Sequence, residues 1–288
     1  MSAEFPPAVL VARHAMATRF EFVLHGSNPA ALRAAAEEAL DEVDRQEGQL
    51  SLFRPGSDLA RINASGHHAP VRMAPEVFRL IERALALSHA TDGAFDITAG
   101  TWMRALGFHA PGEPEPFHEI PTLSSVPGNG IELDPSAFTV RLTRAGVRLD
   151  LGAIGKGYAL DRAADLLRDA GVSSALLHGG TSTIVAVGTT PSGEPWKVAL
   201  PTGEAIPLRD ESLSVSATWG RTVRSGTTTL GHVIDPRSGT PVEGNRMAAL
   251  VCASATDSDA LSTALLVLGP AGRDAVLRAA RSTRSWFA

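Results

Sequence analysis

The segment LDLGAIGKGYALDRA, from Leu149 to Ala163, combines three glycines with one lysine, Lys156. Its apolar start is typical of a strand and its end of a helix, so the glycines and the lysine fall at a strand-to-helix turn. Backbone N–H groups and an ammonium at such a turn suit a phosphate group. The spacing is not that of a Walker A loop, because Gly152 stands only three positions before Gly155 and Gly157 follows the lysine. A tight turn with a solvated lysine is the alternative.

Two further segments carry side chains that could take part in acid–base chemistry. GAFDITAG, residues 93–100, places Asp96 in a turn, where a carboxylate is usually a cap. GHVIDPRSGTPV, residues 231–242, places His232 three positions before Asp235. A histidine and a carboxylate at this spacing could act as acid and base or form part of a metal site.

DSDALSTALLVLG places Asp259 and Thr263 four residues apart, on one face of a predicted helix. A carboxylate and a hydroxyl are hard oxygen ligands of the kind that Mg²⁺ prefers. We expect both side chains to be exposed at the helix start, where the fold would tolerate alanine. Capping of the helix by Asp257 or Asp259 is the alternative interpretation.

Composition limits the classes of function. The chain has 288 residues, of which 44% are hydrophobic and 20% charged, with a net charge of −5, and these values are ordinary for a soluble globular protein. No basic stripe indicates a nucleic-acid partner. The single cysteine, Cys252, excludes an internal disulfide and a multi-cysteine metal site, and its segment MAALVCAS predicts a buried strand with an inert thiol.

The chain shows no targeting or membrane signal. No apolar run approaches the ~20 residues of a membrane span. The N-terminal AVLVA is too short for a signal peptide and is followed by Arg13, and no lipobox cysteine is present. We therefore expect a cytoplasmic protein, unless the given chain has already been processed.

The elements that would position these residues indicate an α+β fold with mixed, antiparallel-rich sheets and packed helices, in one domain across residues 1–288. A β-hairpin is predicted around the Thr143–Gly146 turn, and the stretch His109–Gly130, with five prolines, predicts a surface loop or lid. Helices are predicted after Ser27 or Asn28, after Ala74, over Lys156–Ala170, and from about Asp257 past the Gly269–Pro270 break. Strands are predicted at Thr18–Leu24, Ala175–His178, Thr183–Val187, Trp196–Leu200 and Met247–Ala253.

Taken together, these segments resemble the FAD:protein FMN transferase (ApbE) family in order and spacing, from about Met16 to Gly269. MATRF is similar to the family's Met-Gly-Thr opening, with Ala17 in place of glycine. LSLFRPGSDLARIN and GAFDITAG resemble the next two motifs. LDLGAIGKGYALDRA, HVIDPRSGTPV and SDALSTALLVLG are similar to the family's last three signatures.

The resemblance implies an enzyme that takes FAD as substrate, requires Mg²⁺, and moves FMN onto a threonine or serine hydroxyl of an acceptor protein, releasing AMP. It implies metal ligands at the Ala153 carbonyl, Asp259 and Thr263, and a charge-neutralising role for Lys156. The catalytic base would be His232 or Asp235, with His232 favoured. The residues implied to contact FAD are Met16, Phe53, Ala94, Phe95, Asp96, Asp150, Lys156 and the backbone near Ile234.

Two other functions remain open on the sequence. An FAD pyrophosphatase would use water in place of the acceptor hydroxyl and yield FMN and AMP. A non-catalytic flavin-binding protein would leave FAD intact.

Overall fold

The computed structural model describes residues 7–109, 130–220, 222–225, 228–282 and 284–288, and its centre is a seven-stranded antiparallel sheet. The strands lie in the order β1-β2-β6-β7-β10-β15-β16, with bounds Ala8–Ala15, Thr18–His25, Ser174–Gly179, Thr183–Gly188, Ser212–Ala217, Met247–Cys252 and Arg284–Phe287. A smaller sheet has the order β3-β5-β4, at Val71–Arg72, Thr139–Leu142 and Ile131–Asp134. Three two-stranded pairs complete the strands: β8 and β9 at Trp196–Ala199 and Ala205–Leu208, β11 and β12 at Thr222–Ser225 and Thr228–Gly231, and β13 and β14 at Ile234–Asp235 and Thr240–Pro241.

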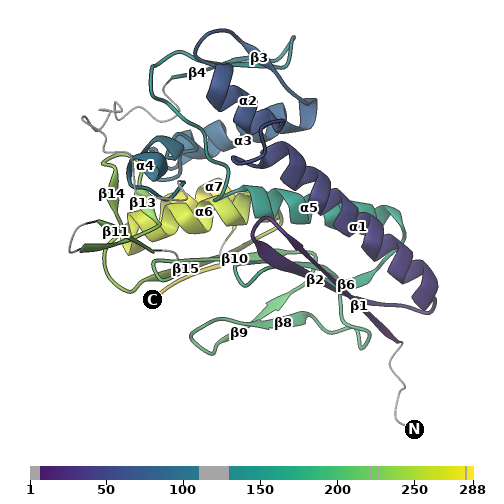
Figure 1. The fold of residues 1–288 in the computed structure, drawn as a ribbon. Helices are drawn as coiled ribbons and strands as arrows, with labels where there is room; N and C mark the ends of the chain where they lie inside the picture. Colours follow the sequence, from purple (N-terminus) through teal and green to yellow (C-terminus); the bar gives the residue numbers. More distant parts are fainter. Residues whose placement is uncertain (1–6, 110–129, 221, 226–227, 283) are drawn as a thin grey trace.

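Helices cover one face of the large sheet. The α-helices of the described residues are α1 (Pro29–Leu50), α2 (Asp58–Ser65), α3 (Pro75–Ala90), α4 (Gly100–Ala105), α5 (Gly155–Asp169), α6 (Ala255–Leu268) and α7 (Arg273–Ala280), and not all of them contact this sheet. Figure 1 shows α1, α5 and α6 in one layer above this sheet, with α2, α3 and the small sheet above them. The β8–β9 pair packs its apolar side chains on the opposite face of the large sheet. The predicted α+β class is confirmed.

Local sequence signals explain most helix boundaries. Asn28 caps α1 by accepting a hydrogen bond from the Ala31 N–H at 3.1 Å, and Pro29 occupies the first turn. Gly171 follows α5 with a φ of +79°, which suits a glycine after a helix. Capping of α6 by Asp257 or Asp259 is wrong, because Ser254 is the cap and accepts from the Asp257 N–H at 3.2 Å.

The predicted hairpin at Thr143–Gly146 is also wrong in its second arm. β5 pairs with β3 and β4, and the residues after Gly146 leave that sheet. The side chain of Asn63 holds Leu149 instead: its amide N–H donates to the Leu149 carbonyl at 2.9 Å, and its oxygen accepts from the Leu149 N–H at 2.7 Å. A buried asparagine therefore takes the place of a partner strand and directs the chain toward α5.

The β1–β2 hairpin ends in a strained two-residue turn. Ala15 pairs with Thr18, and the two residues between them, Met16 and Ala17, have φ values of +49° and +57°. This is the geometry of a type I′ turn, in which glycine is favoured because a Cβ is disfavoured at positive φ. Ala17 therefore carries backbone strain at the position where the family motif has glycine.

We expect Ala17→Gly to stabilise the fold by roughly 0.5–1 kcal/mol, because the relief of strain exceeds the added entropy of the unfolded chain. Thermal unfolding measures this difference. Ala12→Gly, in the extended and exposed part of β1, is the matched control and should destabilise by about the same amount. Destabilisation by both substitutions would contradict the assigned turn.

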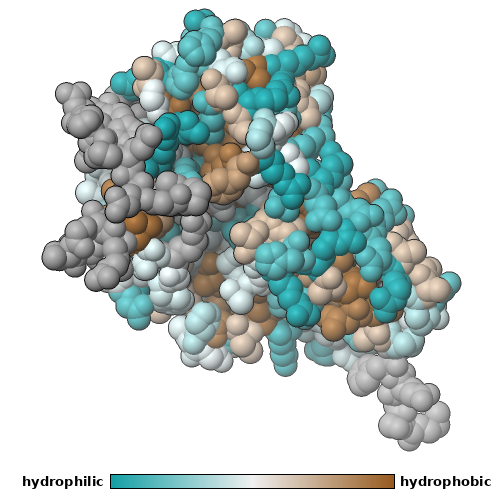
Figure 2. Space-filling view, in the orientation of Figure 1, coloured by the Kyte–Doolittle hydropathy of each residue, from teal (hydrophilic) through white to brown (hydrophobic). Residues whose placement is uncertain are grey.

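The distribution of polar side chains on the surface and the burial of Cys252 are those expected of a globular protein. Figure 2 shows hydrophilic side chains over much of one face and apolar ones gathered around a central hollow. Within the described ranges, no helix is both long and apolar enough to span a bilayer. Cys252 is buried at the end of β15, so the predicted buried strand is confirmed, and burial raises the pKa of its thiol to about 12, which supports the prediction of an inert thiol. Of the predicted proline-rich loop, only His109 and Gly130 are described, so its role as loop or lid lies outside the described residues.

Candidate active site

Helices α5 and α6 are linked by Asp161, near the end of the segment Leu149–Ala163. Asp161 of α5 accepts hydrogen bonds from the N–H groups of Ala255 and Thr256, both at 2.8 Å, and from the Ser254 hydroxyl at 2.9 Å. Burial raises the pKa of this carboxyl, while the hydrogen bonds oppose that effect. The contact supplies the start of α6 with acceptors and fixes α6 against α5.

Asp259 lies at the centre of the candidate site. Its side chain is buried, which makes the expectation of an exposed helix position wrong. One carboxylate oxygen accepts from the Gly157 N–H at 3.0 Å, and the other accepts from the Thr183 hydroxyl at 3.0 Å. The Lys156 ammonium lies 3.5 Å from the first of these oxygens. The start of α5, the start of β7 and the helix α6 thus meet at Asp259.

The turn before α5 completes this cluster. The Lys156 ammonium lies 3.4 Å from the Gly152 carbonyl oxygen, in the turn that also holds Ala153. A positive charge therefore already sits between a backbone carbonyl and the Asp259 carboxylate. Thr263 lies one helical turn beyond Asp259 on α6. Among the described residues no group of three His, Cys, Asp or Glu side chains could hold a metal, so a cation here would depend on these oxygens and on oxygens of a bound substrate. The donor types fit Mg²⁺.

Asp150 links the turn at Gly152 to His109, two segments that the sequence analysis did not connect. One of its carboxylate oxygens accepts from the Gly152 N–H at 2.6 Å, and the other lies 2.7 Å from His109 Nε2. The ring of His109 meets the ring of Phe53 edge to face, with centroids 6.3 Å apart. Phe53 is 67% exposed, so it is not a core residue. An exposed aromatic ring beside a polar pair can stack on a planar ligand.

The turn at residues 94–98 is rigid and internally bonded. Ala94 and Phe95 are buried in the core. Asp96 accepts from the N–H and the hydroxyl of Thr98, both at 2.8 Å, and from the Ser88 hydroxyl at 3.0 Å. The Asp150 N–H donates to the Ile97 carbonyl at 2.8 Å and so fixes this turn beside the previous group. Asp96 therefore has at least a structural role, as the turn interpretation expected.

Ile234 and Asp235 form β13, which packs against α4 through Ile234, and His232 lies two residues before this strand. Ile234 is buried with Trp102 of α4, whose indole N–H donates to the Pro236 carbonyl at 3.2 Å. The Asp235 carboxylate accepts hydrogen bonds from Arg237 Nε at 2.9 Å and Nη2 at 2.7 Å, and this pairing raises the pKa of Arg237. A carboxylate engaged in this way is a weaker candidate base than His232. Met16, in the β1–β2 turn, is half-buried against two core clusters.

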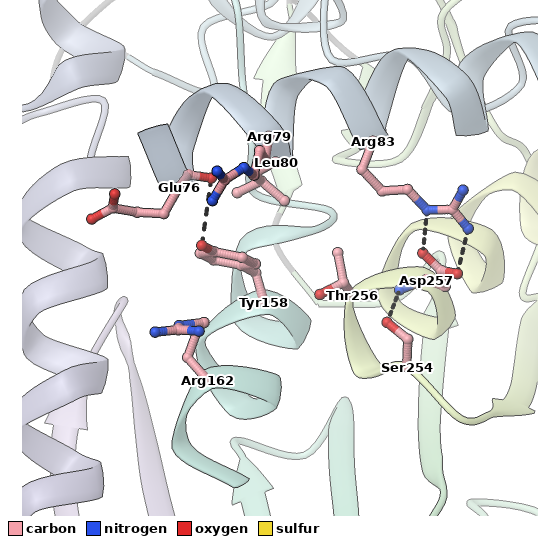
Figure 3. Close-up of a pocket in the computed structure, with 9 residues that line it drawn as sticks. All are labelled: Glu76, Arg79, Leu80, Arg83, Tyr158, Arg162, Ser254, Thr256 and Asp257. Atoms are coloured by element: carbon pink, nitrogen blue, oxygen red, sulfur yellow. Dashed lines mark hydrogen bonds and ion pairs between the residues drawn. The ribbon is translucent and has the colours of Figure 1, made fainter. Parts of the chain in front are cut away.

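A pocket of about 450 Å³ lies elsewhere, between α3, α5 and the start of α6. Figure 3 shows Tyr158 among the residues that line this pocket. It also shows the ion pair between Arg83 of α3 and Asp257 of α6, which links these two helices. Its nine lining residues are Glu76, Arg79, Leu80, Arg83, Tyr158, Arg162, Ser254, Thr256 and Asp257, and none of them is a predicted site residue. The predicted residues therefore gather outside this pocket.

Sequence reasoning missed several residues of the site. His109 was read only as the first residue of a loop, and Thr183 only as the first residue of a strand. Neither carries a local signal, because their partners Asp150 and Asp259 are 41 and 76 residues away along the chain. Spatial pairing of this kind has no periodic pattern to reveal it.

Comparison with known proteins shows the family of this chain. The ApbE family model matches residues 16–286. Proteins named FAD:protein FMN transferase from Klebsiella pneumoniae (strain 342) and Treponema pallidum (strain Nichols) are each 31% identical to this chain, covering 85% and 88% of it and 79% and 77% of the relatives. The apo form of the Pseudomonas stutzeri flavinyl transferase ApbE superposes with a TM-score of 0.81 at 26% identity, covering 100% of this chain and 94% of that one. The ApbE protein of Thermotoga maritima gives the same TM-score, 0.81, at 27% identity, covering 94% and 90%. The chain belongs to the ApbE family.

Proposed function

We propose that this ApbE-family enzyme transfers FMN from FAD to a threonine or serine hydroxyl of an acceptor protein, releasing AMP in an Mg²⁺-dependent reaction. The observation that carries the proposal is the cluster of Lys156 and Asp259, 3.5 Å apart, beside the 152–154 turn. Basic, acidic and carbonyl groups converge there, and groups of these types suit a diphosphate and its cation. The names of the relatives supply the flavin chemistry.

Each residue type has a task in such a reaction. Asp259, Thr263 and the Ala153 carbonyl would hold Mg²⁺, which when bound neutralises charge on the diphosphate oxygens. Lys156 adds a second positive charge at the same place. In-line attack by a hydroxyl depends more on positioning and charge neutralisation than on a strong base. We assign acceptance of the hydroxyl proton to His232, because histidine is the side chain that most often acts as a general base.

The flavin would extend from this cluster toward the Asp150 group. Asp150 and the 94–96 turn are linked through the Ile97 carbonyl, and His109 connects Asp150 to Phe53. The backbone near Ile234 and the side chain of Met16 are proposed as further FAD contacts.

The test is to incubate the protein with FAD and Mg²⁺, with and without an acceptor protein that carries a Thr/Ser flavinylation site. We expect AMP release only with the acceptor, and flavin fluorescence on the acceptor after denaturing electrophoresis. Omission of Mg²⁺ should abolish both signals. AMP and free FMN without acceptor would indicate a pyrophosphatase, and intact FAD under all conditions would indicate a binding protein.

Phe53→Ala should weaken FAD binding by about 1–2 kcal/mol, or roughly 5–30-fold, if the ring stacks on the flavin. Because Phe53 is 67% exposed, the melting temperature should hardly change. Quenching of flavin fluorescence measures the affinity. Phe53→Tyr, which keeps the ring, is the control and should bind as the parent does. Equal affinity of the alanine variant would remove Phe53 from the FAD contacts.

A further inference from the structure

Serines line the face of β10 that packs on α6. The Ser214 hydroxyl is fully buried and lies 2.7 Å from the hydroxyl of Ser258. Further along the strand, the Ser216 hydroxyl lies 2.8 Å from that of Ser262 and 3.0 Å from that of Thr263. Burying hydroxyls is unfavourable unless they are hydrogen-bonded, and apolar side chains would serve packing alone. Packing alone therefore does not explain why hydroxyl side chains occupy the contact between β10 and α6.

The proton of the Thr263 hydroxyl has two acceptors within the protein. Thr263 Oγ1 lies 3.0 Å from Ser216 Oγ, in a contact in which either oxygen can donate, and 3.4 Å from the Asp259 carbonyl oxygen, which can only accept. Ser262 Oγ lies 3.0 Å from the same carbonyl oxygen and 2.8 Å from Ser216 Oγ. Whether Thr263 donates to Ser216 or to the carbonyl, its oxygen keeps at least one lone pair for another partner.

The Asp259 carboxylate is held in a matching way from the neighbouring strand. Thr183 of β7 is fully buried, pairs with Ser214 of β10 in the sheet, and donates to one carboxylate oxygen at 3.0 Å. The Gly157 N–H donates to the other oxygen at 3.0 Å. These two hydrogen bonds limit rotation of the carboxylate. The oxygen that accepts from Thr183 retains a lone pair for a cation, whereas the other oxygen also lies 3.5 Å from the Lys156 ammonium.

We propose that Ser216 and Thr183 are positioning residues for the metal: Ser216 turns the lone pairs of Thr263 toward the cation, and Thr183 fixes the orientation of Asp259. This inference rests on the proposed function, in which Asp259 and Thr263 bind Mg²⁺. Groups that hydrogen-bond to metal ligands typically change metal affinity by about 10–100-fold when removed.

The test measures Mn²⁺ binding by electron paramagnetic resonance in the presence of FAD, on the full chain. Ser216→Ala and Thr183→Val should each weaken Mn²⁺ binding by about tenfold or more. Ser216→Thr and Thr183→Ser keep the hydroxyls and should restore it. Ser214→Ala is the matched control, since it removes a buried hydroxyl of the same strand face that touches neither Asp259 nor Thr263.

Each outcome separates the two ideas. If the parent protein binds no Mn²⁺ with FAD, the proposed metal site fails, whatever the variants do. If the parent binds Mn²⁺ and Ser216→Ala and Thr183→Val bind it equally well, only the positioning role is overturned. If Ser214→Ala weakens binding as much as they do, the effect arises from general loosening of the β10–α6 contact, and the positioning role is again overturned.

Discussion

Asp259→Asn should lower the rate of FMN transfer by about 100–1000-fold, the range found when one electrostatic stabiliser of a transition state is removed. The substitution keeps the volume of the side chain and removes its charge. The amide oxygen can accept from Gly157, while the Thr183 hydroxyl can rotate and accept from the amide N–H. We therefore expect the fold to remain. Lys156 loses its counter-charge, and a bound cation loses its only proposed carboxylate ligand.

Two measurements on the same variant separate catalysis from stability. FMN transfer to an acceptor should fall, and the rise in melting temperature that Mg²⁺ with FAD causes should disappear. Asp257→Asn, two residues earlier on α6, is the control: its carboxylate pairs with Arg83 at the separate pocket, so transfer should persist. An Asp259→Asn enzyme with full Mg²⁺-dependent transfer would rule out the metal assignment.

Asp259→Ala is a poorer probe than the sequence suggests. At an exposed helix position alanine would be harmless, but here the side chain is buried and three groups point to it. Removing it leaves the Thr183 hydroxyl, the Gly157 N–H and the Lys156 ammonium without their acceptor. Unpaired buried groups cost about 1–3 kcal/mol each, more if charged, so loss of activity in this variant could reflect loss of structure.

Local patterns predicted those parts of the fold that are determined by neighbours in sequence. The start of α1 and the extent of α5 are decided within a few residues: Asn28, one of the two residues predicted to precede the first helix, is its cap, and the helix predicted over Lys156–Ala170 agrees with α5 to within one residue at each end. The strand predicted at Thr18–Leu24 likewise lies within β2, where Phe20, Phe22 and Leu24 are fully buried.

Two of the failures share one physical cause, which is competition from partners far along the chain. The predicted hairpin lost its second arm to Asn63, 86 residues away from Leu149. The predicted exposure of Asp259 failed because Gly157, 102 residues away, and Thr183 close over it. Helix periodicity could place Asp259 and Thr263 on one face but could not identify what packs against that face.

Gly157→Ala should be among the most damaging single changes in the chain. A Cβ at this position would lie 2.0 Å from the carbonyl oxygen of Ala255 and 2.9 Å from the Cβ of Asp259. The first contact is with backbone, which cannot rotate away, so α5 and α6 would have to separate. We expect a loss of about 3 kcal/mol of stability, equivalent to a fall in melting temperature of about 5–10 °C.

Gly155→Ala, two residues earlier in the same turn, makes the opposite case. Its Cβ would meet only Leu50 Cδ1, at an ordinary 3.7 Å, and alanine favours a helix over glycine, so stability should stay equal or rise by up to about 1 kcal/mol.

The contrast between Gly157→Ala and Gly155→Ala also bears on function. The Gly157 N–H binds the Asp259 carboxylate, so separating α5 from α6 should weaken Mn²⁺ binding even at temperatures where the variant remains folded. Equal melting temperatures for Gly157→Ala and Gly155→Ala would contradict the close packing of α5 on α6 at Gly157. The glycines of the segment Leu149–Ala163 would then serve ligand binding and not the packing of the two helices.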